Sequence, residues 1–217
     1  MARWAVFDVD GTLFPLSSME KIFISFMIKN GAIPVQNIFT YFLIGLHRSL
    51  FKGFEEGFKN NKYYLKYLPA PPVSKRAAKF VLQQIWPQIS TTGLQRLAEY
   101  RLKNYQILIM SGSPDFLTQP LAEIIKPDFS IAAELEIRNN HFTGKLNNLH
   151  PYGKRKSQLL FDHQSVLQIQ FDKSVVFANH HADYHHMELF GKAIAVNPTS
   201  KLKLLARKHN WQTEIWK

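Results

Sequence analysis

Four short apolar segments, each followed by polar or turn residues, constrain the fold of this chain most strongly. Their length and composition are typical of buried β-strands. Helical patterns lie between them, and strands that alternate with helices predict a parallel sheet covered by helices. We therefore expect an α/β protein with a Rossmann-like core. The strand segments are Trp4–Val9, Gln106–Ser111, Ser174–Ala178 and Ala193–Val196, and the helical patterns are Thr92–Lys103, Asp115–Ile125, Arg155–Gln168 and Lys201–Asn210.

Two regions depart from this alternation. Residues 14–87 contain no convincing strand and predict three or four helices inserted after the first core strand. Residues 129–146 alternate in polarity, turn at Asn139-Asn140 and alternate again, which predicts a small β-hairpin. We expect a core made of residues 1–13 and 88–217, with residues 14–87 as an inserted α-helical cap subdomain.

The first strand ends in two carboxylates, Asp8 and Asp10, in the stretch WAVFDVDGTL. Residues two apart in an extended segment point the same way, so both acids can face one crevice beyond the sheet, while Gly11 lets the chain turn away. Neighbouring anions repel unless a cation or proton lies between them. The pattern therefore favours a metal site with one carboxylate as nucleophile and the other as proton donor or acceptor. The alternative is a strand that ends in a turn and uses aspartate for turn chemistry.

The run from this strand through D-x-D-G-T-L resembles the first motif of the haloacid dehalogenase superfamily of phosphatases. The second motif of that family is an apolar strand that ends in Ser or Thr, and LIMSGSP places Ser111 there, with Gly112 and Ser113 leading into a helix whose amides could hold phosphate oxygens. The third is a lysine, and YGKRKSQLL fits the pattern G-x-x-K-x-x-x-L with Lys156, or alternatively with Lys154. Without the resemblance, S-G-S-P predicts a turn or helix cap, and the lysines predict a solvated helix start.

The fourth motif of the family reads G-D-x-x-x-D, and its first aspartate binds magnesium. The matching stretch ANHHAD has Asn179 at that position and Asp183 at the last. Asparagine still offers a carbonyl oxygen to a hard cation but brings no charge. Because one charge pair at ~4 Å and an effective dielectric of ~20 is worth about 4 kcal/mol before desolvation, we expect weaker metal binding.

The resemblance extends to the phosphoserine-phosphatase-like branch, in which a helical cap follows the first motif and closes over the pocket. The stretches SGSPDFLTQPLAEII, AAELEIRNNHFTGKL and AIAVNPTSKLKLLARKHNW carry it. It implies a Mg²⁺-dependent aspartyl-phosphate mechanism. In this mechanism Asp8 would attack phosphorus, and Asp10 would protonate the leaving alcohol and then activate water. The phosphate would be bound by Ser111, Gly112 and Lys156. Mg²⁺ would lie between Asp8, the Asp10 carbonyl and Asn179, and Asp183 would support the metal site from behind these ligands.

Four histidines, His180, His181, His185 and His186, cluster around the fourth motif. His181 and His185 have the spacing that could chelate a transition metal on a helix, but no H-E-x-x-H motif accompanies them. We expect surface or pocket-lining histidines that could bind a phosphate or a proton.

Composition restricts the partners. The chain has 217 residues, is 46% hydrophobic, has no cysteine, and carries a net charge of +11, which favours anionic partners. Residues 14–87 hold 10 basic and 3 acidic side chains, so most of that charge lies in the predicted cap. No nucleic-acid motif accompanies the charge. The apolar segment 22–46 is interrupted by polar residues, Gly and Pro, so no membrane span is predicted. We therefore expect a cytoplasmic protein. The sequence does not determine its oligomeric state.

We expect a phosphatase that acts on a small phosphorylated metabolite. Phosphoserine itself is not predicted, because Asn61 stands where the family has a cap arginine and the early glutamate position falls near Ser17 rather than Glu20. The cap holds nearly half of the chain's aromatic residues, which predict an aromatic subdomain core or, alternatively, a lipid phosphate substrate at a membrane surface. A degenerate protein that binds phosphorylated ligands without turnover is the other alternative, because of Asn179.

Overall fold

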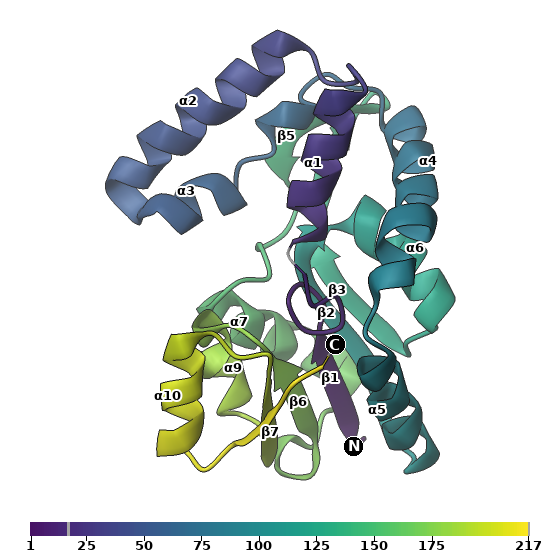
Figure 1. Cartoon of the computed structure of the whole chain (residues 1–217), viewed down its shortest axis with the longest axis vertical. Coiled ribbons are helices and arrows are strands. Elements are labelled where there is room, and N and C mark those ends of the chain that lie inside the picture. Colours follow the sequence, from purple (N-terminus) through teal and green to yellow (C-terminus); the bar gives the residue numbers. More distant parts are fainter. Residues whose placement is uncertain (17, 217) are drawn as a thin grey trace.

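The computed structural model describes residues 1–16 and 18–216. A sheet of six parallel strands forms the core in the order β3-β2-β1-β6-β7-β8, flanked by helices (Figure 1), which confirms the predicted α/β, Rossmann-like fold. The strands are β1 Trp4–Asp8, β2 Gln106–Pro114, β3 Phe129–Ala133, β6 Val175–Ala178, β7 Lys192–Val196 and β8 Gln212–Glu214. The flanking helices are α5 Thr91–Leu102, α6 Asp115–Ile125, α7 Lys154–Asp162, α8 Gln164–Leu167, α9 Tyr184–Met187 and α10 Ser200–Lys208.

Strand β1 is central and apolar on both sides. Its residues alternate between two hydrophobic clusters, with Ala5 and Phe7 in the cluster that includes α5 and α6, and Trp4 and Val6 in the cluster that includes α7, α9 and α10. All five residues of β1 are buried. The strand is therefore fixed firmly in the middle of the sheet, and the residues at its carboxyl end have a fixed position.

Helices α1 to α4 follow β1 and lie beyond the carboxyl end of the sheet (Figure 1). We propose residues 14–87 as the cap subdomain. Part of its aromatic content forms a core, because the Phe23 ring lies 5.2 Å from that of Phe80 and 5.5 Å from that of Phe116 in α6. The elements are α1 Met19–Lys29, α2 Val35–Lys52, α3 Phe54–Lys59, a 3₁₀ turn Tyr63–Leu65, α4 Ala70–Phe80, a π-helical turn Val81–Ile85 and a 3₁₀ turn Trp86–Gln88.

The prediction of one hairpin over residues 129–146 is partly wrong. Its first part is β3, which pairs in parallel with β2, and only β4 Leu135–Arg138 and β5 His141–Leu146 form the hairpin. The turn lies at Asn139 and Asn140, whose φ angles of 49° and 60° asparagine tolerates. The hairpin packs on the cap, where the Phe142 amide donates to the Leu68 carbonyl at 3.0 Å.

Two further features complete the fold. The sequence does not predict β8, because this edge strand is polar and partly exposed and has no apolar pattern. Within residues 1–16 and 18–216, no helix combines the length and apolar character needed to cross a bilayer.

Candidate active site

The carboxyl ends of β1, β2 and β6 meet at one edge of the sheet, beneath the cap. Asp8 is the last residue of β1, Ser111 lies near the end of β2, and Asn179 follows β6 directly. Because β1 pairs with both β2 and β6, side chains from three separate parts of the chain converge there. The sheet thus brings the residues predicted from the first, second and fourth motifs to one edge.

Asp8 is a buried carboxylate with a partner on each oxygen. The Lys156 ammonium donates to its Oδ1 at 2.6 Å, and the Thr12 hydroxyl donates to its Oδ2 at 2.9 Å. Burial raises the pKa of Asp8 to about 7, although Lys156 works in the opposite direction. Both oxygens are therefore fixed in position, and the lysine compensates part of the cost of burying the charge.

Lys156, near the start of α7, bridges two buried acids. Its Nζ lies 2.6 Å from Asp8 Oδ1 and 2.8 Å from Asp183 Oδ1, and its side chain is 3% exposed. Burial alone would lower the pKa of Lys156, but the charges of Asp183 and Asp8 raise it above the usual value. Burial alone would raise the pKa of Asp183, but the charge of Lys156 holds that pKa below its usual value. Lys154, the alternative lysine, is exposed.

Asp10 is held by groups from β2 and from the cap. Ser111 Oγ donates to Asp10 Oδ2 at 2.8 Å, and Ser113 Oγ lies 2.9 and 3.1 Å from its two oxygens. The amide of Met19, the first residue of α1, donates to Asp10 Oδ1 at 2.7 Å. The hydroxyl of Ser111, predicted to bind phosphate, thus donates to Asp10 here.

Sequence analysis gave Ser113 no catalytic or binding role. The available signal was the S-G-S pattern, because serines two apart in a strand point the same way. As expected, Gly112 and Ser113 lead into a helix, since β2 continues to Pro114 and α6 begins at Asp115.

Asn179 packs directly against the turn that carries the two acids. Gly11 has a φ of +87°, and a Cβ there would lie 2.0 Å from Asn179 Nδ2, so only glycine permits this approach. The Asn197 amide, from the loop after β7, donates to the Gly11 carbonyl at 3.4 Å. The turn after β1 is therefore fixed from the β6 and β7 side of the sheet.

A cavity of about 680 Å³ opens above these residues. Its lining includes Asp8, Asp10, Gly112, Lys156 and Asn179, so these predicted residues share one space, whereas Ser111 is fully buried and does not line it. The cap contributes a wall that is largely apolar. That wall includes Leu16, Ile24, Tyr41, Phe42 and Phe58.

The cap wall also carries a charge pair that sequence analysis missed. The Lys62 ammonium lies 2.6 Å from both oxygens of Glu20, which lines the cavity, and the Tyr64 hydroxyl donates to Glu20 at 2.9 Å. No motif indicates a pair so distant in sequence. Asn61 is buried and bonds to the Tyr41 carbonyl at 2.7 Å, as a structural residue of the cap. Ser17 lies outside the described residues.

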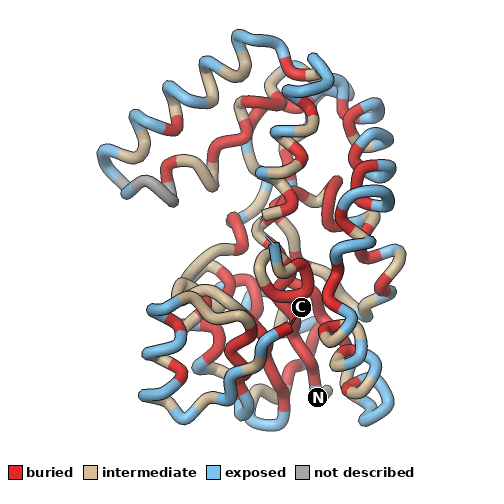
Figure 2. The backbone as a smooth tube through the Cα atoms, in the orientation of Figure 1, coloured by how far each residue is buried: buried red, intermediate tan, exposed pale blue. Residues whose placement is uncertain are grey.

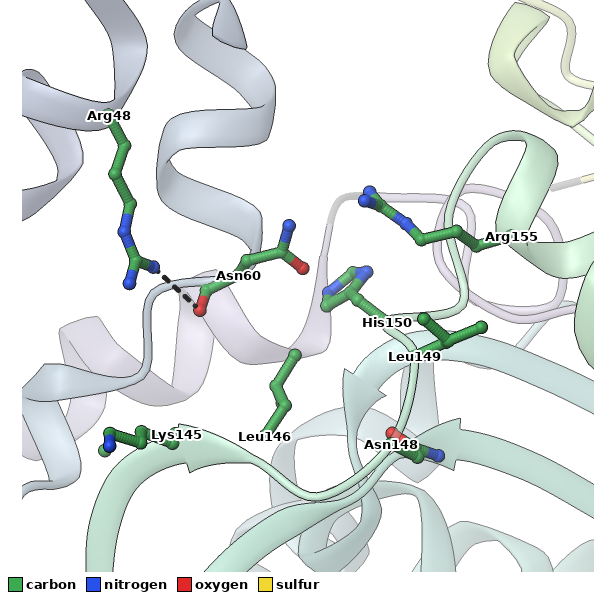
Figure 3. A pocket seen from close by; sticks show the side chains of 9 residues that line it. Arg48, Asn60, Lys145, Leu146, Asn148, Leu149, His150 and Arg155 are labelled. Atoms are coloured by element: carbon green, nitrogen blue, oxygen red, sulfur yellow. Dashed lines mark hydrogen bonds between the residues drawn. The ribbon is translucent and has the colours of Figure 1, made fainter. Parts of the chain in front are cut away.

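A second cavity of about 370 Å³ lies beside the first, between the cap and the loop before α7 (Figure 3). Arg48, Lys145 and Arg155 line it, and Arg48 donates to the Asn60 carbonyl at 3.3 Å. His150 borders both cavities. Burial, reinforced by Lys62 and Arg155, lowers the pKa of His150 well below its usual value, so this histidine is neutral near pH 7.

Two histidines of the fourth motif lie together, since the ring centroids of His180 and His181 are 4.2 Å apart. His180 lines the large cavity, and its Nδ1 accepts from the Ala182 amide at 3.3 Å. His186 is buried 3.8 Å from Asp183, and burial together with Lys156 lowers its pKa to about 3. No group of three or more His, Cys, Asp or Glu side chains with a metal-binding arrangement occurs in the part of the chain that the structure describes.

A family model described as haloacid dehalogenase-like hydrolase matches residues 5–188. No curated protein matches. Among solved structures, a protein with unknown function from Bordetella pertussis Tohama I is 19% identical, with a TM-score of 0.82 and coverage of 99% of this chain and 98% of that one. Phosphoserine phosphatase in its apo form is 16% identical, with a TM-score of 0.66 and coverage of 100% and 94%.

A third similar structure is a phospho-aspartyl intermediate analogue of phosphoserine phosphatase, which is 18% identical, with a TM-score of 0.64 and coverage of 100% and 94%. These similarities show that the chain shares the fold of phosphoserine phosphatases, as its sequence predicts. The family match spans most of the chain and includes the strand and turn that carry Asp8 and Asp10. The chain therefore belongs to the haloacid dehalogenase-like hydrolases.

Proposed function

We propose that this protein is a Mg²⁺-dependent phosphatase that hydrolyses a phosphate monoester through an aspartyl-phosphate on Asp8. The observation that carries the proposal is the pair of acids on one turn. Asp8 is bound to Lys156 at 2.6 Å, while Asp10 is held separately by two serines, and both line the same cavity. Two acids in such different surroundings can take different roles.

Asp8 is the nucleophile in this proposal. It lines the cavity, while Lys156 and Thr12 hold the carboxylate in place. An oxygen of Asp8 forms a bond to phosphorus as the bond between phosphorus and the leaving oxygen breaks. Lys156 favours the ionised form of Asp8, against the effect of burial, and offers positive charge to the transferring phosphoryl group.

Asp10 is the general acid and base. It gives its proton to the leaving oxygen in the first step, and it then takes a proton from the water that attacks phosphorus and releases Asp8. The hydrogen bonds from Ser113 and from the Met19 amide orient it, and Met19 is the first residue of α1. Ser111, the Gly112 amide and Lys156 are proposed to bind the phosphate oxygens.

The donor atoms of the site fit a hard cation. Among the described residues, Asp8 and Asp183 both contact the buried Lys156 and Asp10 lines the same cavity, so three carboxyl groups offer oxygen ligands beside this lysine. The Asp8 carboxylate, the Asp10 backbone carbonyl and the Asn179 side chain would hold Mg²⁺. When bound, Mg²⁺ would supply positive charge that stabilises the phosphoryl group in transfer. Asp183 keeps Lys156 in place beside Asp8.

The similar structures support this assignment by analogy. One of them is a phospho-aspartyl intermediate analogue of phosphoserine phosphatase, and this chain shares its fold. The cavity of about 680 Å³ accommodates a small phosphorylated molecule. Because the cap wall is largely apolar, we propose a substrate that carries an apolar group.

The first test is hydrolysis of a generic aryl phosphate across a magnesium titration, with native protein and the Asn179→Asp variant. We expect hydrolysis by the native protein and a lower magnesium requirement in Asn179→Asp, by about tenfold or more, because a carboxylate replaces a neutral ligand. Asn104→Asp adds the same charge in the exposed loop before β2, at the opposite edge of the sheet, and should leave the requirement unchanged.

A different result would support the alternative function of binding without turnover. If the native protein is inactive at every magnesium concentration while Asn179→Asp gains activity, the native chain is a binding protein for phosphorylated ligands. Asn179 is the specific observation that favours this second candidate.

A further inference from the structure

Helix α2 carries apolar side chains on both its inner and its outer side, and Ile38 and Tyr41 pack against the core. The residues that face the protein include Asn37, which donates to the Lys66 carbonyl at 2.7 Å, and Arg48, which donates to the Asn60 carbonyl at 3.3 Å. The opposite face carries six large apolar side chains that are 52–78% exposed. We call this face the α2 stripe; it consists of Val35, Phe39, Phe42, Leu43, Leu46 and Leu50.

The α2 stripe follows the helical repeat, so its members form one continuous surface along the helix. Figures 1 and 2 show α2 standing away from the sheet, with exposed residues along its length. Contiguous exposed apolar surface of this kind marks a site of interaction, since water contact with large apolar side chains is unfavourable. The predicted aromatic core does not cover Phe39, which is 64% exposed, whereas the Phe42 ring packs on the rings of Tyr41 and Phe58 while it stays partly open to solvent.

The charge around the α2 stripe indicates the kind of partner. Helix α2 contains no acidic residue, and residues 14–87 carry 10 basic against 3 acidic side chains. A second copy of this chain would bring the same net positive charge, so charge favours an anionic partner over a second copy. An anionic bilayer offers both an apolar interior for the stripe and negative headgroups for the basic cap.

The α2 stripe is continuous with the active-site cavity. Phe42 belongs to the stripe and also lines the cavity, as does Leu16, which is 62% exposed. A surface that covers the stripe therefore lies beside the cavity that contains the site. A phosphate monoester with an alkyl or acyl chain could enter with its phosphate toward Asp8 and its chain along the apolar wall.

We propose that the α2 stripe docks on an anionic lipid bilayer and that the substrate is a phosphate monoester with an apolar chain drawn from that bilayer. The substrate part of this inference rests on the proposed phosphatase function. The docking part does not, and it is tested without turnover.

Docking is measured by co-sedimentation of the Asp8→Asn variant with vesicles, so that no hydrolysis occurs. The vesicles contain equimolar phosphatidylcholine and phosphatidylglycerol, or phosphatidylcholine alone. We expect binding to the anionic vesicles, at least about tenfold weaker binding to the neutral ones, and release at high salt. Adding Phe39→Glu and Leu46→Glu should weaken binding to the anionic vesicles by more than about a hundredfold, because two large apolar side chains are replaced by charges.

The matched control is Leu102→Glu. Leu102 is 85% exposed at the end of α5, far from the cap, and its variant should bind vesicles as the parent does. Absence of binding to anionic vesicles would overturn the docking. So would a native dimer that Phe39→Glu/Leu46→Glu converts to monomer, since the stripe would then be an interface between two copies.

The substrate part is tested with dodecyl phosphate placed in the anionic vesicles and with ethyl phosphate in solution. Protein with intact Asp8 should hydrolyse dodecyl phosphate at least about tenfold faster than its Phe39→Glu/Leu46→Glu variant, while the two hydrolyse ethyl phosphate equally. Equal rates on dodecyl phosphate would contradict the membrane-borne substrate. Failure of both proteins on ethyl phosphate and on aryl phosphate would instead contradict the phosphatase function.

Discussion

Asp8→Asn is expected to lower the rate of aryl phosphate hydrolysis by more than about a thousandfold, because an amide oxygen cannot replace the carboxylate as nucleophile. The fold should be kept. Asparagine has the same shape and can still accept from Thr12, and Asp183 remains as a partner of Lys156. Since burial raises the pKa of Asp8 to about 7, the folded protein disfavours the charge that the variant removes. We therefore expect no fall in the thermal unfolding midpoint measured in EDTA.

The control for this variant is Asp172→Asn, which makes the same chemical change at an exposed site and should leave the rate unchanged. If Asp8→Asn hydrolyses aryl phosphate at a rate within about tenfold of the native rate, Asp8 is not the nucleophile. If Asp8→Asn loses both its activity and its fold, the role of Asp8 as nucleophile is tested by direct detection of the phosphorylated intermediate.

Lys156→Met is expected to cost both activity and stability. Lys156 is the cation shared by Asp8 and Asp183, both buried, and its loss would leave two carboxylates without their ion-pair partner. Removing one partner from a buried ion pair typically costs about 3–5 kcal/mol, and protonation of one acid would recover part of this. We expect a loss of about 3 kcal/mol in the free energy of unfolding, measured by urea denaturation at pH 7.

Lys154→Met is the matched control, since this lysine lies two residues earlier on the same helix and is exposed. Its free energy of unfolding should change by less than about 0.5 kcal/mol, and its activity should remain. Equal effects of the two substitutions would contradict the role given to Lys156.

The fold could be predicted from local patterns because its central strands are short, apolar and buried. β1 is a clear case, since each of its residues is buried and its two acids follow at once. The strand β8 could not be predicted from the sequence, because an edge strand pairs through backbone groups, which need no apolar side chains. β3 was assigned to the hairpin because alternation alone does not say which neighbour a strand pairs with.

The site was predictable where one motif carries it, and not where it depends on contacts between distant residues. Asp8 and Asp10 share a turn, whereas the ion pair of Glu20 with Lys62 joins residues 42 positions apart. The choice of Lys156 over Lys154 likewise needs the position of α7 against β1. The exposure of the α2 stripe could not be predicted, because helical periodicity identifies an apolar face but not whether another element covers it.

Direct detection of a phosphorylated Asp8 tests the central claim. Native protein would be mixed with aryl phosphate and Mg²⁺, quenched in acid within a turnover, digested, and examined by mass spectrometry. The account predicts a phosphoryl group on the peptide that contains Asp8, located on that residue, and none in Asp8→Asn. Release of the aryl alcohol by native protein with no phosphoryl group on Asp8 at any quench time, or with one on another residue, would contradict it.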